Sequence, residues 1–363
     1  MVYMRVYGQD KVVVFWVRSR LVTLRHHVAV TREYYLLKYA KFYLTGKMMR
    51  TLLALSYVSS TALLTACGGG SSDDPLPIVN TTQAVNIQFA AQANNQDVKC
   101  GAVNEVSNLG TSNKTAELQD LRFYVSSLQL INNKGQAVNV SLDKNEYQNY
   151  GVALLDFEDA TGSCAGDATL HTVITGKVPT GTYTGIKFTL GVPDTGLDEL
   201  AKTIDLNHSN TTAINAPLDV AAMAWSWQGG RKFAKIEVKP TGGVVNQKGT
   251  PDTTDDATVS SWVVHIGATG CTGSDAAGYS CTNPNLANIT LNSFDAAKQK
   301  VVLDVPALLA QSDIALNKNS AVGCMSGATD SECGVIFEAL GLDLLTGKAH
   351  STKTQTVFKV VAK

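Results

Sequence analysis

Phe233-Ala-Lys-Ile-Glu-Val-Lys239 alternates strictly between apolar and charged side chains. Successive side chains of a strand point to opposite faces, so positions 234, 236 and 238 share an apolar face and positions 235, 237 and 239 a charged one. Turn residues enclose the stretch, with Gly229-Gly230 before it and Pro240-Thr-Gly-Gly243 after it. The stretch therefore predicts a strand with one face in a core and the other in polar surroundings.

Nine other short segments also favour strands, and turn residues separate them: Val85–Phe89, Leu121–Leu130, Val152–Phe157, Leu170–Val178, Tyr183–Val192, Met223–Gln228, Trp262–Ile266, Ile289–Phe294 and Lys300–Val305. Leu197–Lys202 and Cys333–Leu340 favour short helices, the second closed by Gly341. We therefore predict an all-β fold: a β-sandwich-like single domain over residues 84–363, with disulfide-stapled loops and a short C-terminal helical segment. Residues 241–260, rich in glycine, threonine and aspartate, are expected to form a long surface loop within it.

Charge is distributed unevenly along the 363 residues. Residues 1–66 hold 10 of the 30 basic residues and 2 of the 31 acidic ones, which leaves 20 basic and 29 acidic residues, a net charge of −9, for residues 67–363. This acidic body gives no electrostatic reason to expect nucleic-acid binding, so we exclude that class of partner.

The N-terminal part has the features of an export signal. Met48-Met49-Arg50 precedes an apolar run, Thr51–Leu64, of signal-peptide length, and Leu64-Thr-Ala-Cys67 resembles the bacterial lipobox. We interpret 48–67 as a lipoprotein signal peptide in which Cys67 receives the lipid, and 68–83 as a flexible tether to the membrane. Gly68 after the cysteine resembles signals sorted to the outer membrane, which predicts an exported, lipid-anchored protein facing the periplasm. The alternative is a short buried helix followed by a loop.

Residues 1–47 show neither a hydrophobic period nor helix-capping signals. We interpret them as a mis-annotated upstream extension, with the true start at Met48 or Met49. The alternative is a genuine cytoplasmic extension, which would bury the signal peptide.

Six cysteines remain beyond Cys67, and an even number in an exported chain suggests three disulfides. Cys271 and Cys281 flank one Gly-, Ser- and Asp-rich loop, and Cys324 and Cys333 flank another. Local pairs are the simplest choice, and they leave Cys100 with Cys164. The rival interpretation is a thiolate metal site, although the chain has no CxxC and its ten-residue spacings suit zinc poorly.

Motifs for catalysis are absent: the sequence has no GxSxG, Walker A, HExxH or CxxCH, so we expect a protein that is not an enzyme. Three histidines of the body, His171, His208 and His265, lie in distinctive surroundings, and imidazole suits copper and zinc. Each of them alone would more often be structural than a ligand.

Two tryptophans lie two residues apart in Met223-Ala-Trp-Ser-Trp-Gln228. On a strand, Trp225 and Trp227 would point to the same face about 7 Å apart. Core packing, an aromatic platform for a sugar or peptide, and oxidative modification are three interpretations of this pair.

An ordered set of motifs resembles the MbnP-like copper-binding proteins, also called the four-Cys proteins of the metallo-mystery pair system. The resemblance covers most of residues 84–343, and its four-Cys motif corresponds to Cys271, Cys281, Cys324 and Cys333. The motifs are Leu121-Arg-Phe-Tyr-Val-Ser-Ser-Leu128, Leu155-Asp-Phe-Glu158 with Gly162-Ser-Cys164, His171-Thr-Val-Ile-Thr-Gly176, Phe188-Thr-Leu-Gly-Val-Pro193, Asn207-His208, Met223-Ala-Trp-Ser-Trp-Gln228, Lys232-Phe233, His265-Ile-Gly267, Cys271, Cys281-Thr-Asn-Pro-Asn285, Gly323-Cys-Met-Ser326 and Glu332-Cys333.

This resemblance implies a copper protein on the periplasmic side, paired with a MauG-like dihaem peroxidase or oxidase that converts a tryptophan to kynurenine. The implied copper ligands are the three histidines, the residue to be modified is one of the two tryptophans, and Met223 and Met325 are potential soft ligands for Cu(I). Arg231 stands where the family usually has an aromatic residue before Lys-Phe, and the 241–260 loop is longer than usual. Both differences bear on partner docking or on access to the site.

Two other functions remain open. A surface module for glycans or peptides would use the tryptophan pair as its platform. An enzyme would need paired carboxylates of the Asp156 and Glu158 type, but the sequence shows neither a nucleophile nor acid–base geometry for it.

Overall fold

The computed structural model describes residues 81–164, 166–225, 229–318 and 320–363, and the short segments 7–8 and 11–12. The chain divides into two units, Met1–Leu76 and Pro77–Lys363. In the first, β1 (Tyr7–Gly8) pairs with β2 (Lys11–Val12). The expected signal peptide, its Cys67, the tether up to residue 80 and Trp227 lie outside the described residues.

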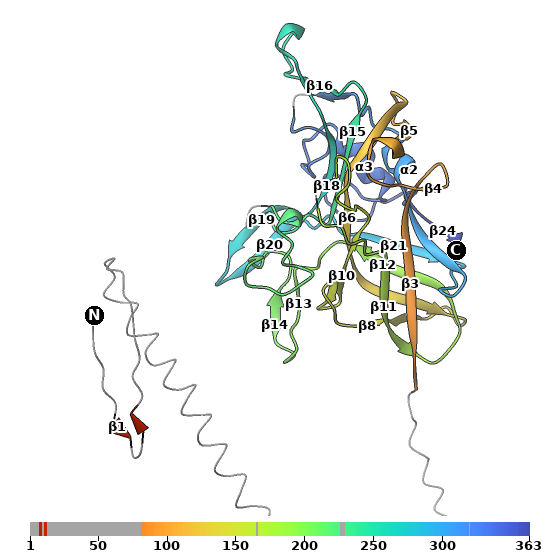
Figure 1. The fold of residues 1–363 in the computed structure, drawn as a ribbon, viewed down its shortest axis with the longest axis vertical. Helices are drawn as coiled ribbons and strands as arrows, with labels where there is room; N and C mark the ends of the chain where they lie inside the picture. The colour runs from red at the N-terminus through yellow and green to blue at the C-terminus, as the bar shows by residue number, and fades with distance from the viewer. Residues whose placement is uncertain (1–6, 9–10, 13–80, 165, 226–228, 319) are drawn as a thin grey trace, which may run out of the picture. The chain divides into compact units, whose positions relative to one another are not determined.

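The long strand β6 (Lys114–Asn132) organises a nine-stranded sheet in the second unit (Figure 1). β15 (Ala234–Pro240) pairs with its first half and β12 (Tyr183–Leu190) with its second half, while β10 (Val152–Asp156) pairs with residues 122–126 on the opposite edge. The other strands of this sheet are β5 (Val106–Leu109), β7 (Ala137–Asn139), β9 (Gln148–Asn149), β18 (Trp262–Ile266) and β21 (Ala287–Asn292).

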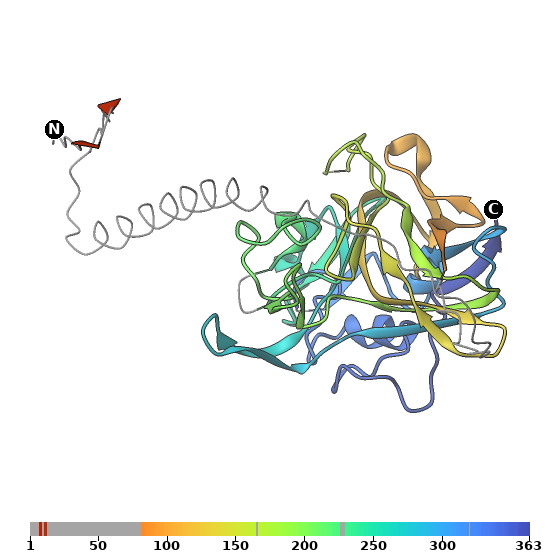
Figure 2. The ribbon, with the colours of Figure 1, turned by 90° about the horizontal axis from the view of Figure 1, so that it is seen from below.

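A six-stranded sheet faces the first one, in the order β24-β22-β3-β11-β8 with β4 paired to β3 (Figures 1 and 2). β22 runs parallel to β3, whereas the other pairs of this sheet are antiparallel. The strands are β3 (Thr82–Ala93), β4 (Gln96–Asp97), β8 (Ser141–Leu142), β11 (Val173–Pro179), β22 (Gln299–Asp304) and β24 (Phe358–Ala362).

Phenylalanine rings fill the space between the sheets. Phe89 of the six-stranded sheet lies 6.3 Å from Phe123 and 5.5 Å from Phe188, measured between ring centroids, and Phe358 lies 5.3 Å from Phe188. Phe123 pairs with Ala234 in the ladder, so the apolar face of the 233–239 stretch points into this core. The predicted all-β sandwich is confirmed, and the charged face of that stretch lies on the outer side of the nine-stranded sheet.

A hairpin replaces the helix expected over 197–202. β13 (Thr195–Leu197) pairs with β14 (Thr203–Asp205), and the carboxylate of Asp198 accepts hydrogen bonds from the backbone N–H groups of Leu200 and Lys202. The helical expectation was wrong because this aspartate closes a turn, as short polar side chains do in Asx turns.

The long loop expected over 241–260 is also partly ordered into strands. β16 (Val244–Gln247) pairs antiparallel with β17 (Ala257–Val259) and parallel with the distant β23 (Leu316–Lys318). A 3-10 turn, η3 (Thr253–Asp255), lies at the tip, and another, η1 (Ala102–Asn104), precedes β5. A partner strand more than 50 residues away gives no signal in local sequence, which explains the error.

Helices are few and short. α3 (Cys333–Ala339) confirms the predicted C-terminal helix, and Gly341 follows it with φ 73°, a conformation that favours glycine. α2 (Val305–Leu309) was not predicted, and the side chain of Asp304 caps it by accepting from the N–H of Ala307 at 3.1 Å. In the described part of the chain, no helix has the length and apolar character needed to cross a membrane.

Three disulfides join the six cysteines in the pairs that their spacing predicts: Cys100–Cys164, Cys271–Cys281 and Cys324–Cys333. The second pair links β19 (Thr269–Ser274) to β20 (Gly278–Asn283), and the third links the bridge at Val264 to α3. With their sulfurs bonded to one another, these cysteines do not form the rival thiolate site.

Candidate metal centre

One row of paired residues crosses the outer face of the nine-stranded sheet. His171 is bridged to Asp156, Asp156 pairs with Arg122, Arg122 with Lys235, and Lys235 with His265. Neighbouring strands lie about 4.8 Å apart, so the four steps separate the two histidines by about 19 Å. A single metal ion cannot bind both rings, and the expectation that all three histidines share one site needs this correction.

His171 lies at one end of the row and is held by local contacts. Its Nδ1 lies 2.7 Å from the carbonyl oxygen of Leu154, and its ring stacks on Tyr147 with centroids 4.2 Å apart. Burial lowers the pKa of this imidazole, and its hydrogen bond to Leu154 opposes that shift. The structure therefore gives His171 a packing role at the edge of the sheet.

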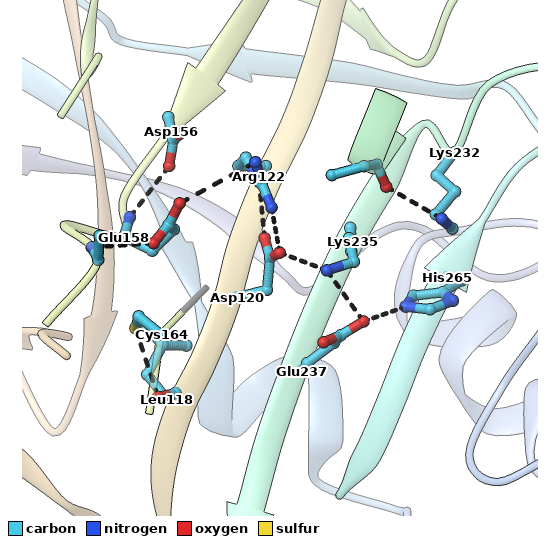
Figure 3. Close-up of polar contacts among 12 residues, drawn as sticks. Leu118, Asp120, Arg122, Asp156, Glu158, Cys164, Lys232, Lys235, Glu237 and His265 are labelled. Atoms are coloured by element: carbon cyan, nitrogen blue, oxygen red, sulfur yellow. Dashed lines mark hydrogen bonds and ion pairs between the residues drawn. The ribbon is translucent and has the colours of Figure 1, made fainter. Parts of the chain in front are cut away.

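Charged side chains fill the middle of the outer face (Figure 3). Arg122 donates to both carboxylate oxygens of Asp120 and lies 4.0 Å from Glu158. Lys235 pairs with Asp120 and lies 3.1 Å from Glu237. Burial raises the pKa of Asp156 to about 7 against the opposing effects of a backbone hydrogen bond and of Arg122.

His265 lies at the other end of the row. Its Nε2 lies 2.7 Å from Oε1 of Glu237, as Figure 3 shows. Burial would raise the pKa of Glu237, but the contacts with His265 and Lys235 lower it to about 2, so the carboxylate stays charged. The other ring nitrogen of His265, Nδ1, is buried and has no hydrogen-bond partner among the described residues.

His208 follows β14, and Figure 1 shows β14 on the same flank of the molecule as the β19–β20 hairpin. Its ring stacks on Tyr279 with centroids 4.6 Å apart, and its Nε2 lies 3.5 Å from Sγ of Cys281. The side chain is buried, and its Nδ1 has no hydrogen-bond partner within the described chain. Burial lowers the pKa of this imidazole, although Asp205 opposes the shift, so the ring is neutral at pH 7.

Trp225 does not lie in a strand. The expected strand over 223–228 is replaced in its described part by the 3-10 turn η2 (Ala221–Met223), and the N–H of Trp225 donates to the carbonyl of Gly230 at 2.9 Å. The indole packs against Gly267, where a Cβ atom would lie only 2.5 Å from Cζ3 of the ring. Since Gly267 follows His265 by two residues, the indole of Trp225 lies beside the end of the row that holds His265.

Two cavities flank Trp225. One of about 230 Å³ is lined by His208, Trp225 and Arg231 among others. The other, more open, of about 570 Å³ is lined by Trp225, Cys271 and Met325. The structure thus gathers His208, Trp225 and Met325 in one region, whereas Met223 is fully buried in the core.

Arg231 is a supporting residue that the sequence revealed only as an unusual position. Its buried guanidinium donates to the carbonyl oxygens of Asn207 at 2.8 Å, Ser209 at 2.7 Å and Leu218 at 2.7 Å. Burial lowers its pKa, with Tyr124 opposing the shift. Because the carbonyls of Asn207 and Ser209 flank His208, the arginine holds the histidine segment next to Arg231 and Gly230.

Comparison with known proteins identifies the family. The MbnP family model matches residues 82–326, most of the chain. The chain belongs to the MbnP family. A solved structure, MbnP from Methylosinus trichosporium, is 37% identical, with a TM-score of 0.70 over 78% of this chain and 99% of that one. No curated protein matches this chain.

Family membership confirms the resemblance that the ordered motifs indicate. The matched region begins at residue 82, where β3 begins, and it includes the three candidate histidines and the Trp225 segment. The disulfide of Cys324 reaches beyond its end to α3, so the C-terminal helix is covalently tied to the matched region.

Proposed function

We propose that this MbnP-family chain is an exported copper-binding protein whose metal centre forms around Trp225, with His208 and His265 as its imidazole ligands. The observation that supports it most is the position of His208, which lines the same cavity as Trp225 and whose buried Nδ1 makes no hydrogen bond among the described residues and lies 4.0 Å from Asp205. A neutral buried imidazole with an unused nitrogen suits a copper ion.

The residues present fit such a centre, because His265 contributes a second unpartnered Nδ1 and Met325 a nearby thioether. Glu237 accepts from Nε2 of His265 and fixes the orientation of its ring, as carboxylates often do for metal-binding histidines. Bound there, copper would supply a redox-active or transportable ion. His171 takes no part in this centre, since it lies about 19 Å across the sheet from His265.

Tryptophan itself is a poor ligand, since its indole offers only an N–H donor. We propose that a MauG-like dihaem peroxidase oxidises Trp225 to kynurenine. Two molecules of hydrogen peroxide cleave the C2–C3 bond of the indole to give N-formylkynurenine and two waters, and hydrolysis then releases formate. The product has an aromatic amine and a ketone that can ligate or position copper, and the open cavity beside Trp225 gives access to the ring.

Copper stoichiometry and peptide mass spectrometry on protein purified from its native source test this centre. We expect native protein to contain copper and an oxidised Trp225 peptide, and His208→Gln to lose copper. His171→Gln is the matched control, because its ring is also stacked on a tyrosine but lies outside the centre. Unmodified Trp225 and Trp227, together with unchanged copper in the His208 and His265 variants, would refute the proposal.

Lipid anchoring through Cys67 at the periplasmic face of the outer membrane is part of the proposed function. The anchor would hold an acidic binding protein, with a net charge of −9 over residues 67–363, in the compartment that contains exported metal ions and the periplasmic oxidase. Membrane fractionation of wild type and Cys67→Ala tests the anchor: the variant should move to the soluble fraction, and equal membrane retention would contradict it.

A glycan- or peptide-binding module is the second candidate, favoured by the open cavity of about 570 Å³ beside the half-buried Trp225. It predicts ligand binding that survives metal chelation and is lost in Trp225→Ala. Binding that disappears with chelation would favour the copper centre instead.

A further inference from the structure

The Cys271–Cys281 disulfide lies against the imidazole of His208. One ring nitrogen and the two sulfurs all lie within 4.8 Å of one another, and Nε2 lies 3.5 Å from Sγ of Cys281. A disulfide sulfur is a weak metal donor, whereas a thiolate is among the strongest donors for soft ions. The ligand strength of this cluster therefore depends on the oxidation state of its two sulfurs.

Exposure distinguishes this disulfide from the other two in the described chain. Cys100, Cys164, Cys324 and Cys333 are all buried, with 0–8% of their surface exposed. Cys271 and Cys281 are partly exposed, and Cys271 lines the open cavity beside Trp225. A dithiol reductant that attacks accessible sulfurs will thus reach this pair first.

The backbone keeps the two sulfurs together without the covalent bond. Cys271 faces Cys281 directly in the β19–β20 ladder, and the neighbouring pairs Thr272–Ser280 and Gly273–Tyr279 continue the hairpin. Tyr279 and Cys281 point to the same face of β20, since they are two residues apart. Tyr279 stacks on the ring of His208, so the same face holds the imidazole beside the sulfur.

We propose that reduction of Cys271–Cys281 creates a Cu(I) site whose ligands are the two thiolates and the imidazole of His208. A dithiol reductant transfers two electrons and two protons to the disulfide, which yields two thiols and the oxidised disulfide of the reductant. One Cu(I) ion then displaces both thiol protons and binds two sulfurs and one nitrogen. Two soft thiolates and one imidazole suit Cu(I), whereas structural zinc sites use four ligands.

This site rests on the proposed function for its choice of metal, and it shares His208 with the copper centre described above. It requires neither a modified tryptophan nor His265. The exported chain would accordingly have two copper-binding states that differ in the oxidation state of one disulfide.

Selective reduction followed by Cu(I) titration tests the site. The exported chain is produced without the partner oxidase and freed of copper, so that the centre at Trp225 is not formed and His208 is available. It is treated with a low concentration of tris(2-carboxyethyl)phosphine, freed of reductant by gel filtration, and titrated anaerobically with Cu(I) in competition with bicinchoninate. Alkylation and peptide mapping identify the reduced cysteines. We expect alkylation at Cys271 and Cys281 alone and one additional equivalent of Cu(I) relative to the untreated protein.

Variants separate this site from simple loosening of the fold. Cys271→Ser/Cys281→Ser should bind no additional Cu(I) after the same treatment, and His208→Gln should bind it at least tenfold more weakly. His171→Gln should behave as wild type. Circular dichroism before and after reduction checks that the chain stays folded. The comparison of untreated with reduced wild type uses no variant, so it tests the site even where a variant fails to fold.

Equal Cu(I) uptake by untreated and reduced wild type would overturn the inference, as would full additional uptake by the double serine variant. Alkylation of the buried cysteines in place of Cys271 and Cys281 would also overturn it. A different result refutes the proposed function: native oxidised protein that contains neither copper nor a modified tryptophan. The site formed by reduction is then still tested by the same Cu(I) titration.

Discussion

At Gly267 the sheet and the Trp225 loop come into contact so close that no side chain fits. A Cβ atom there would lie 2.5 Å from Cζ3 of Trp225 and 2.6 Å from the carbonyl oxygen of Arg231. The ring has little room to retreat, because the N–H of Trp225 is bound to Gly230. The identity of this one residue therefore determines where the indole lies relative to the candidate ligands.

Gly267→Ala should destabilise the fold by about 1–3 kcal/mol, the usual cost of overpacking, and weaken copper binding. Urea unfolding and tryptophan fluorescence measure the two effects. Gly334→Ala in α3 is the matched control: a Cβ there meets nothing within 4 Å, and alanine favours a helix, so stability should rise slightly. If Gly267→Ala were as stable as wild type, the indole would have moved to make room for the Cβ atom, which contradicts the close contact.

Glu237 makes the metal-free protein sensitive to acid. Its pKa is about 2 in the folded state, below the ordinary value of 4.5, so folding favours the charged form. The resulting stability is fully present above pH 4.5 and is lost as the pH falls towards 2. Solvent screening of the partly exposed carboxylate limits the effect to about 1–2 kcal/mol. Urea unfolding between pH 2 and 6 should show this loss in wild type and a flatter profile in Glu237→Gln.

Asp156 has the opposite effect on the pH dependence of stability. Its pKa is about 7 in the folded state and 3.8 ordinarily, because burial disfavours the charged form. The unfolded chain binds fewer protons between these values, so this residue lowers stability as the pH rises from 4 to 7. Asp156→Asn should remove that decline in urea unfolding. A steeper decline in the variant would contradict the assignment.

At the scale of elements, the outer face of β6 is the feature that local sequence describes least well. The alternation in residues 233–239 predicts the strand and its two faces, and both are observed. The sequence does not show that Asp120 and Arg122 of β6 are buried on the polar face, because the segments that cover them follow much later in the chain. Tyr124, on the same face, donates to the carbonyl oxygen of Pro217 at 2.9 Å in one such segment.

Arg122→Met should cost about 3–5 kcal/mol at pH 7, because it leaves the carboxylate of Glu158 buried without its cation and Asp120 with Lys235 alone. The cost should shrink at pH 5, where buried carboxylates take up protons more easily. Denaturant unfolding at both pH values measures it. Lys298→Met removes an exposed ion pair with Asp295 and should change nothing measurable. A similar cost in both variants would contradict the buried network.

Turns and irregular segments were harder to predict than strands for a physical reason. The side chain of Asp198 closes a hairpin turn where a helix was expected over 197–202, and a backbone hydrogen bond joins Trp225 to Gly230 where a strand was expected. Such short-range hydrogen bonds compete with regular structure at nearly equal free energy, so composition alone cannot rank them.

At the scale of the whole molecule, the sequence predicted the sandwich, the cysteine pairs and the family, but not the arrangement of the three histidines. His171 and His265 are separated by four ladder steps, and this register depends on strands far apart in sequence. His208 and Trp225 come together because Arg231 binds carbonyls beside His208. Only the assembled sheets and loops reveal that His208 lies beside Trp225 and that His171 lies far from His265.

Loop length should set the contribution of each buried disulfide to global stability. Cys100–Cys164 closes a sequence separation of 64 residues and Cys324–Cys333 one of 9, and all four cysteines are buried. In the chain-entropy account these loops contribute about 4 and about 2.5 kcal/mol. Cys100→Ala/Cys164→Ala should therefore be less stable than Cys324→Ala/Cys333→Ala by about 1.5 kcal/mol in guanidinium unfolding of the copper-free protein. Since both pairs lose two buried sulfurs, their cavity costs are similar and largely cancel. Equal losses would instead assign the stabilisation to native-state packing around the sulfurs, and a larger loss for the short loop would reverse the argument.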